Sequence, residues 1–124
     1  MIRLFLLTLC ALGVFSSGCE GPQHNAQFGK RTVNDMIDYV DHIKEEYRFL
    51  RVIDKTVTYP PPNQDPSTVL INFIEVTDLY TNGNGGCPTL VSGGPGFNHT
   101  TIQFTSKRNH GLDFLLRIFV QKYL

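Results

Sequence analysis

Hydrophobic and polar residues alternate along most of the chain after residue 48. Such alternation places apolar side chains on one face of a β-strand and polar side chains on the other. In the last alternating segment, Leu112, Phe114 and Leu116 share one face, and Asp113 and Arg117 lie on the other. Turns rich in glycine, proline and asparagine separate these segments. The predicted strands are 49–59, 69–77, 89–91, 100–105 and 112–120.

Short strands joined by such turns predict a mainly β protein. We expect a small antiparallel sandwich or barrel of about five or six short strands. Once an N-terminal segment is removed, roughly 106 residues remain, which is the size of one small domain. No internal repeat is visible in the sequence.

Residues 33–47 follow a different pattern, because their apolar positions recur every three or four residues. Charged residues fill most other positions, so periodicity favours one N-terminal helix near 33–47. Thr32 and Asp35 resemble a helix N-cap followed by an acid in the first turn. The alternative is an edge strand, because the residues from 37 to 41 also alternate locally.

The first 18 residues have the pattern of a secretory signal peptide. Arg3 precedes about a dozen mostly apolar residues, and the small residues of 16–18 follow them. The apolar run is shorter than the roughly 20 residues that a bilayer core requires. We therefore expect 1–18 to be removed after Gly18 or Cys19, leaving an exported chain without a membrane anchor. Residues 19–31 are polar and predict a loose leader, followed by a single β-rich domain over 32–124.

Gly29, Lys30 and Arg31 form a sequence that can direct the processing of secreted peptide precursors. Cleavage there would release a short amidated peptide ending at Phe28. The sequence shows no second processing site of this kind. Release of a peptide is therefore a third interpretation of the chain.

The charges balance, with eleven basic and eleven acidic residues. A protein dedicated to nucleic acid concentrates lysine and arginine against phosphates, so we expect no direct binding to nucleic acid. The sequence also contains no polybasic segment, and we expect no membrane association after signal removal.

The cysteines leave two alternatives open. Cys10 would leave with the signal peptide, so the exported chain contains Cys87 and, depending on the cleavage point, Cys19. An oxidising compartment would favour a disulfide between Cys19 and Cys87. Otherwise Cys87 is a free or buried thiol, which is the alternative we favour from the sequence.

Residue types used in catalysis are present, but their spacing does not indicate a catalytic site. Ser92 lacks the preceding glycine of a nucleophile elbow. The glycine-rich turns lack the lysine and hydroxyl of a phosphate loop. Metal ligands usually come in close pairs, which the histidines do not form. We expect no enzyme activity, no cofactor and no metal, and solvated or hydrogen-bonded side chains for His24, His42, His99 and His110.

Two surface features are predicted. Asn98 begins an N-glycosylation sequon, which is relevant only to a chain that enters the secretory route. A polar loop between the last two predicted strands is a candidate contact site, because binding residues often lie on loops. Its residues are Lys107, Arg108, Asn109 and His110.

Several short motifs are distributed over about 29–119. They are Gly29-Lys30-Arg31 with Asp35, Val57-Thr58-Tyr59-Pro60, Ile74-Glu75-Val76-Thr77-Asp78, Tyr80-Thr81-Asn82-Gly83-Asn84-Gly85-Gly86, Ser92-Gly93-Gly94-Pro95-Gly96-Phe97-Asn98, Thr101-Ile102, Ser106, Arg108, Gly111 and Phe114. Each motif is short, but their combination is specific and resembles the multiprotein bridging factor 2 family of arthropods.

The resemblance implies a small β-rich fold with no catalytic residues to transfer. It also favours a strand over 35–43, against the periodicity. Cys87 stands where the family pattern leads us to expect an aromatic residue, so a disulfide at Cys87 would not belong to the shared pattern.

The resemblance also implies two functions. The family takes its name from a transcriptional coactivator that bridges a nuclear-receptor-type factor to the general transcription machinery, yet many members carry signal peptides and some are salivary or otherwise secreted. We expect an extracellular, non-enzymatic protein of saliva, haemolymph or another secretion, acting on a protein partner or extracellular ligand. The alternative is a nuclear coactivator that acts through protein contacts.

Overall fold

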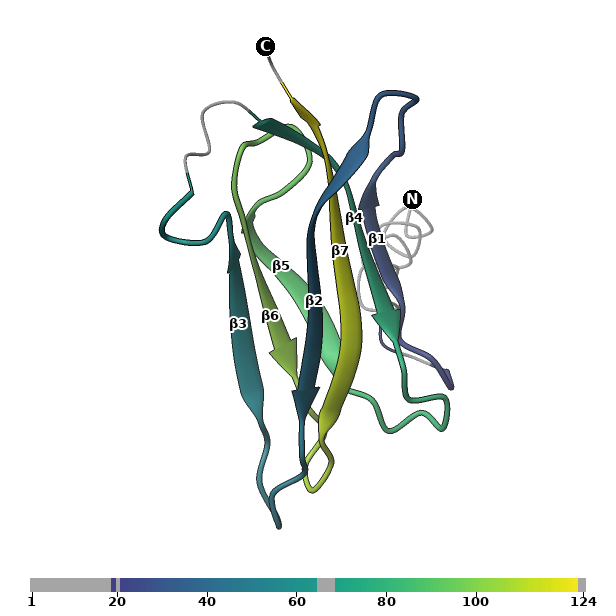
Figure 1. Ribbon diagram of the computed structural model, residues 1–124. Helices are drawn as coiled ribbons and strands as arrows, with labels where there is room; N and C mark the ends of the chain where they lie inside the picture. The colour runs from purple at the N-terminus through teal and green to yellow at the C-terminus, as the bar shows by residue number, and fades with distance from the viewer. Residues whose placement is uncertain (1–18, 20, 65–68, 123–124) are drawn as a thin grey trace, which may run out of the picture.

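The computed structural model describes Cys19 and residues 21–64 and 69–122, and within them seven strands form two antiparallel sheets (Figure 1). The predicted signal peptide, 1–18, lies outside the described residues. One sheet has the strand order β1-β4-β7-β2, and the other has the order β3-β6-β5. The strands are β1 (Ala26–Gly29), β2 (Met36–Glu45), β3 (Asp54–Tyr59), β4 (Val69–Asp78), β5 (Cys87–Gly93), β6 (Thr100–Thr105) and β7 (Leu112–Lys122).

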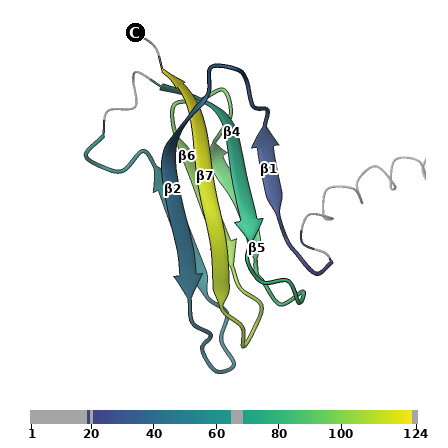
Figure 2. The same ribbon diagram turned by 45° about the vertical axis from the view of Figure 1, so that its right-hand side comes forward.

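The two sheets lie face to face as the layers of a sandwich (Figure 2). This arrangement confirms the predicted mainly β fold and identifies it as a sandwich. The described chain forms seven strands instead of five or six, because the segments interpreted as a leader and a helix contribute β1 and β2.

Apolar side chains from both layers fill the space between the sheets. Phe104 of β6 and Phe114 of β7 are fully buried, and their ring centroids lie 5.1 Å apart. Tyr59 of β3 is also buried, and its hydroxyl donates a hydrogen bond to the Asp38 carboxylate at 2.5 Å. Burial, together with this acceptor, raises the pKa of the Tyr59 hydroxyl. The core is therefore continuous from one sheet to the other.

The helix predicted near 33–47 is wrong, because residues 36–45 form strand β2. β2 pairs with β7, and a bulge between Ile37 and Tyr39 changes which side chains face the core. Tyr39 packs against the core and Ile43 is buried in it, whereas Val40 is 55% exposed on the outer face. Apolar residues on both faces of a bulged strand produced the spacing of three and four, and the strand implied by the family resemblance is correct.

The loose leader predicted for 19–31 is also wrong at its C-terminal end. Residues 26–29 form β1 and pair with β4, in a register that places Phe28 opposite Ile74. Gly29 has a φ of +83°, and a side chain there would collide with the Asn72 carbonyl and Pro95. The glycine of the Gly-Lys-Arg sequence therefore has a structural explanation within the sheet.

The turn before β2 is built around Asp35. Its carboxylate accepts hydrogen bonds from the Thr32 amide and hydroxyl, both at 2.6 Å, and from the Asn72 side-chain amide at 2.6 Å. Desolvation raises the pKa of Asp35, but these bonds and one from Arg31 outweigh it and lower the pKa from 3.8 to about 2. The Thr32–Asp35 signature thus closes a turn before a strand, whereas we had expected it to cap a helix.

Replacing Phe104 with alanine removes a ring from the centre of the sandwich. We expect Phe104→Ala to lower the free energy of unfolding by about 3 to 5 kcal/mol, because the buried contacts are lost and a cavity remains. Phe49→Ala makes the same change at a side chain that is 74% exposed, and it should cost no more than about 0.5 kcal/mol. Urea unfolding measures both values. Similar losses in the two variants would contradict this description of the core.

Asp35 should make stability depend on pH. Its pKa is lower in the folded chain than the ordinary value of 3.8, so its contribution is fully present above that pH and is lost as the pH falls through about 2. We expect Asp35→Asn to be less stable than the natural chain at neutral pH, with the gap narrowing on acidification. Urea unfolding at a series of pH values measures the gap, and a constant gap across the series would contradict this assignment.

Candidate functional site

The predicted contact loop is the turn between β6 and β7. Lys107, Arg108 and Asn109 are exposed, whereas His110 is half-buried. The turn is closed by a hydrogen bond of 3.0 Å from the His110 amide to the Lys107 carbonyl. Asn109 has a φ of +67°, a left-handed conformation that asparagine adopts more readily than most residues. The structure therefore places three of the four predicted residues on the surface.

This turn packs against the connection between β2 and β3, which the sequence analysis did not assign to a site. The Asn109 amide donates to the Arg51 carbonyl at 2.9 Å, and the Leu50 amide donates to the Asn109 side-chain oxygen at 3.2 Å. The Arg108 guanidinium donates to the Leu50 carbonyl at 2.8 Å. At Gly111 the two connections are so close to each other that a side chain on this residue would collide with the Glu45 carbonyl. Residues 46–52 and 107–110 thus form one continuous surface, called here the two-loop surface, at the lower end of the sandwich in Figure 1.

The two-loop surface combines exposed apolar side chains with cations. Phe49 is 74% exposed, Tyr47 61% and Leu50 57%. Arg48 and Arg51 are exposed between and beside them. Residues 47–51 (Tyr-Arg-Phe-Leu-Arg) mix apolar and basic side chains, and this composition could have indicated a contact surface. The periodicity instead assigned 47 to a helix and the residues from 49 onward to a strand. A depression of about 400 Å³ lies beside this surface and is lined in part by Arg48, Arg51, Lys55, Glu45 and Asp54.

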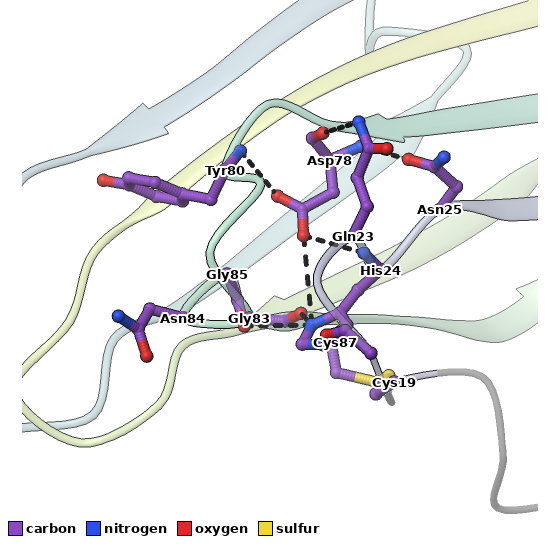
Figure 3. A network of polar contacts seen from close by, with 12 residues as sticks. Cys19, Gln23, His24, Asn25, Asp78, Tyr80, Gly83, Asn84, Gly85 and Cys87 are labelled. Carbon is purple, nitrogen blue, oxygen red and sulfur yellow. Dashed lines mark hydrogen bonds and ion pairs between the residues drawn. A yellow bond between two sulfur atoms is a disulfide. The ribbon is translucent and has the colours of Figure 1, made fainter.

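A second polar feature lies inside the molecule, around Asp78 at the end of β4 (Figure 3). The Asp78 side chain is fully buried. Its carboxylate accepts hydrogen bonds from the His24 amide at 2.9 Å and the Tyr80 amide at 3.0 Å. The Asp78 amide donates to the Asn25 side chain at 2.7 Å, and its carbonyl accepts from Gln23 at 2.9 Å. One buried acid therefore fixes the segment before β1 and the start of the β4–β5 connection.

The His24 ring lies beside this carboxylate and is only 1% exposed. Its Nδ1 is 2.8 Å from the Gly86 carbonyl oxygen and 3.9 Å from the nearer Asp78 oxygen. Its Nε2 is 3.1 Å from the Gly21 carbonyl oxygen. The predicted hydrogen-bonded histidine is therefore an interior residue, although the sequence analysis placed it in a loose segment. Figure 3 shows the ring between the Asp78 carboxylate and the Cys19–Cys87 disulfide, so this network links the segment before β1 to the ends of β4 and β5.

A disulfide joins Cys19 to Cys87 of β5, close to His24 (Figure 3). The two Cα atoms are 5.6 Å apart, and 68 residues separate the cysteines in the sequence. The free or buried thiol that we favoured for Cys87 is therefore not what the structure contains. The segment before β1 is held near the start of β5 by the contact between His24 and Gly86, and this long-range contact brings Cys19 to Cys87.

The remaining candidate residues are separate from both features. Asn98 is half-buried in the turn between β5 and β6, and its glycosylation stays a prediction. His42 contacts the Asp113 carboxylate at 2.5 Å, and His99 lies 3.1 Å from the Asn98 side-chain oxygen. Within the described ranges, no three histidine, cysteine or acidic side chains are grouped as metal ligands would be. The same ranges contain no helix long and apolar enough to cross a membrane.

A family model described as transcription activator MBF2 matches residues 28–120. The chain belongs to the transcription activator MBF2 family. The match begins in β1 and ends in β7, so it covers both sheets of the sandwich and the two-loop surface.

A curated relative of this chain has a different description. The chain is 26% identical over 108 residues to a protein from the bumblebee Bombus ignitus named "Probable salivary secreted peptide". The alignment covers 87% of this chain and 78% of that protein. No solved structure gives a significant match. The family resemblance drawn from the motifs is thus confirmed, whereas Cys19 and His24 lie before the region that the MBF2 model matches.

The structure explains why two of the motifs that resemble the MBF2 family contain Asp78, Gly85 and Gly86. Asp78 organises the buried network, and Gly85 lies against its carboxylate with no space for a side chain. A side chain at Gly86 would collide with the Thr105 carbonyl and Leu112. These motif residues therefore maintain the fold near the end of β4.

Removing the Asp78 carboxylate should destabilise the chain and release its N-terminal segment. We expect Asp78→Ala to lower the free energy of unfolding by about 3 to 5 kcal/mol, because several buried donors lose their acceptor. Asp54→Ala is a matched control, since Asp54 is exposed and its carboxylate accepts a hydrogen bond only from the Thr105 hydroxyl among the described residues, and it should cost less than about 1 kcal/mol.

Hydrogen exchange provides the second readout for Asp78→Ala. Amides of residues 23–25 should exchange faster in this variant than in the Asp54→Ala control, while amides of β7 stay protected. Unchanged protection of 23–25 would show that Asp78 does not hold that segment.

Proposed function

We propose that this chain is exported and acts outside the cell as a non-enzymatic protein, through contacts made by its folded surface. The observation that carries the proposal is the Cys19–Cys87 disulfide, since structural disulfides persist in oxidising compartments. The signal-peptide pattern of 1–18 supports the same destination, as does similarity to a protein named as salivary and secreted.

The contact role is supported by where the polar and apolar side chains lie. The buried His24–Asp78 pair is enclosed by backbone and offers no exposed ring to a substrate. The two-loop surface, in contrast, exposes aromatic side chains and arginines, which are enriched where proteins contact partners. We therefore assign the activity to binding at this surface.

The second candidate is a nuclear coactivator, and the description of the matching family favours it. A coactivator that bridges two proteins needs no basic face for DNA, which agrees with the neutral charge of the chain. A nuclear site would, however, leave the Cys19–Cys87 disulfide in a reducing environment. The disulfide therefore favours the exported protein over the nuclear coactivator.

The third interpretation, release of an amidated peptide ending at Phe28, fits the sandwich poorly. Release of a peptide ending at Phe28 would remove β1 from its pairing with β4, and it would also require the Cys19–Cys87 disulfide to be broken. It would also remove Phe28 from its place against the core. We therefore treat the Gly-Lys-Arg sequence as part of the fold.

The test is to express the full chain with a C-terminal tag in insect cells and to measure it in the medium and in nuclei. We expect processed protein in the medium that begins at Cys19, with both cysteines protected from alkylation until reduction. A variant that interrupts the apolar run, Leu6→Arg with Leu7→Arg, should stay inside the cell.

Other results would overturn the proposal in distinguishable ways. Uncleaved tagged protein concentrated in nuclei, with alkylated cysteines, would favour the coactivator. A tagged product that begins after Arg31, together with a peptide ending in amidated Phe28, would establish the peptide precursor.

A further inference from the structure

We propose that the two-loop surface docks on membranes rich in anionic phospholipid. Phe49 and Leu50 would enter the lipid interface, and Arg48, Arg51 and Arg108 would contact the headgroup phosphates. The inference rests on the contact function proposed above and names the partner of the same surface.

The apolar part of the surface is held outward at the end of the sandwich. Phe49 and Leu50 are adjacent, and they are 74% and 57% exposed. Tyr47 and Val52, on either side of them, are 61% and 43% exposed. Adjacent apolar side chains kept in water by a folded loop are typical of an interaction site.

The two-loop surface itself carries an excess of positive charge, although Glu45 and Asp54 lie beside it. Residues 46–52 and 107–110 contain Arg48, Arg51, Lys107 and Arg108, but only Glu46 as an acid. Within the described part of the chain, none of these four cations forms an ion pair. Because the whole chain is neutral, the rest of it carries a matching negative excess. Such an asymmetry orients the chain with this end toward a negatively charged surface.

The shape of the surface favours a membrane over a protein partner. Both views show the β2–β3 and β6–β7 connections extending past the ends of the strands (Figures 1 and 2), and these connections carry the exposed side chains. A fluid bilayer admits a protruding apolar side chain without a matching pocket, whereas a protein partner must supply a complementary cavity. Hydrogen bonds from Asn109 to Arg51 and from Arg108 to Leu50 fix the loops to each other, which reduces the ordering that binding requires.

The balanced composition led us to expect no membrane association, because the sequence contains no polybasic run. Folding brings Arg48 and Arg51 beside Arg108, more than fifty residues later in the chain. The local positive charge therefore belongs to the tertiary structure and cannot be read from the net charge.

Fluorescence provides a direct test, because the chain contains no tryptophan. Phe49→Trp places one tryptophan at the proposed contact, and Phe97→Trp places one at a half-exposed position in the β5–β6 turn, at the opposite end of the sandwich. Vesicles made of phosphatidylcholine and phosphatidylserine in about equal amounts should shift the emission of Trp at position 49 to shorter wavelength. They should leave the emission at position 97 unchanged, and vesicles of phosphatidylcholine alone should shift neither.

Vesicle sedimentation of the purified natural chain provides the second measurement. The double variant Phe49→Ala with Leu50→Ala should bind the anionic vesicles at least about tenfold more weakly, whereas Phe97→Ala should bind as the natural chain does. Arg48→Gln with Arg51→Gln should also weaken binding and reduce its sensitivity to added salt. Circular dichroism of each variant verifies that the fold is kept.

Three results would overturn the proposal. The first is failure of the natural chain to sediment with anionic vesicles, and the second is equal emission shifts at positions 49 and 97. The third is binding to intact cells that depends on Phe49 and is abolished by prior protease treatment of those cells, which would identify a protein partner. All of these use purified protein, so they leave the export experiment above unaffected.

Discussion

The pairing of β7 with both β2 and β4 is the constraint on which the rest of the sandwich depends. Alternate residues of β7 point into the core, and Leu112, Phe114 and Leu116 are fully buried there. Because side chains alternate along a strand, this one apolar row fixes which face of the first sheet is covered. The registers of β2 and β4 are then fixed relative to that row, and β1 is positioned in turn by β4.

The polar interior follows from the same constraint. Asp78 lies opposite Phe114 in the β4–β7 register, so the position of β7 sets the position of the buried carboxylate. Through its hydrogen bonds Asp78 holds His24, and the nearby disulfide holds Cys19. Burial of the Asp78 carboxylate under the sheet is costly unless the carboxylate is hydrogen-bonded, and the N-terminal segment of the chain supplies a donor to it.

Much of the β architecture could be predicted from alternation alone. The predicted strand 100–105 has the observed bounds, and 69–77 and 112–120 fall one and two residues short at their C-terminal ends. Residues 33–47 could not be interpreted from periodicity, because a bulge and exposed apolar residues imitate a helical spacing. The buried role of His24 was also hidden, since its partners Asp78 and Gly86 lie more than fifty residues away. One loop of the two-loop surface, 107–110, was predicted from a polar turn, and the other, 46–52, was missed because its aromatic residues were assigned to a helix and a strand.

The two-loop surface is discontinuous in the sequence, since Leu50 and Arg51 meet Arg108 and Asn109 only when β3, β6 and β7 are in place. A partly folded chain carries the same side chains but does not display them together. Peptides copied from either loop would likewise lack the arrangement. Any ligand that recognises this surface therefore distinguishes the native chain from its folding intermediates. The chain becomes able to bind such a ligand only when it completes folding.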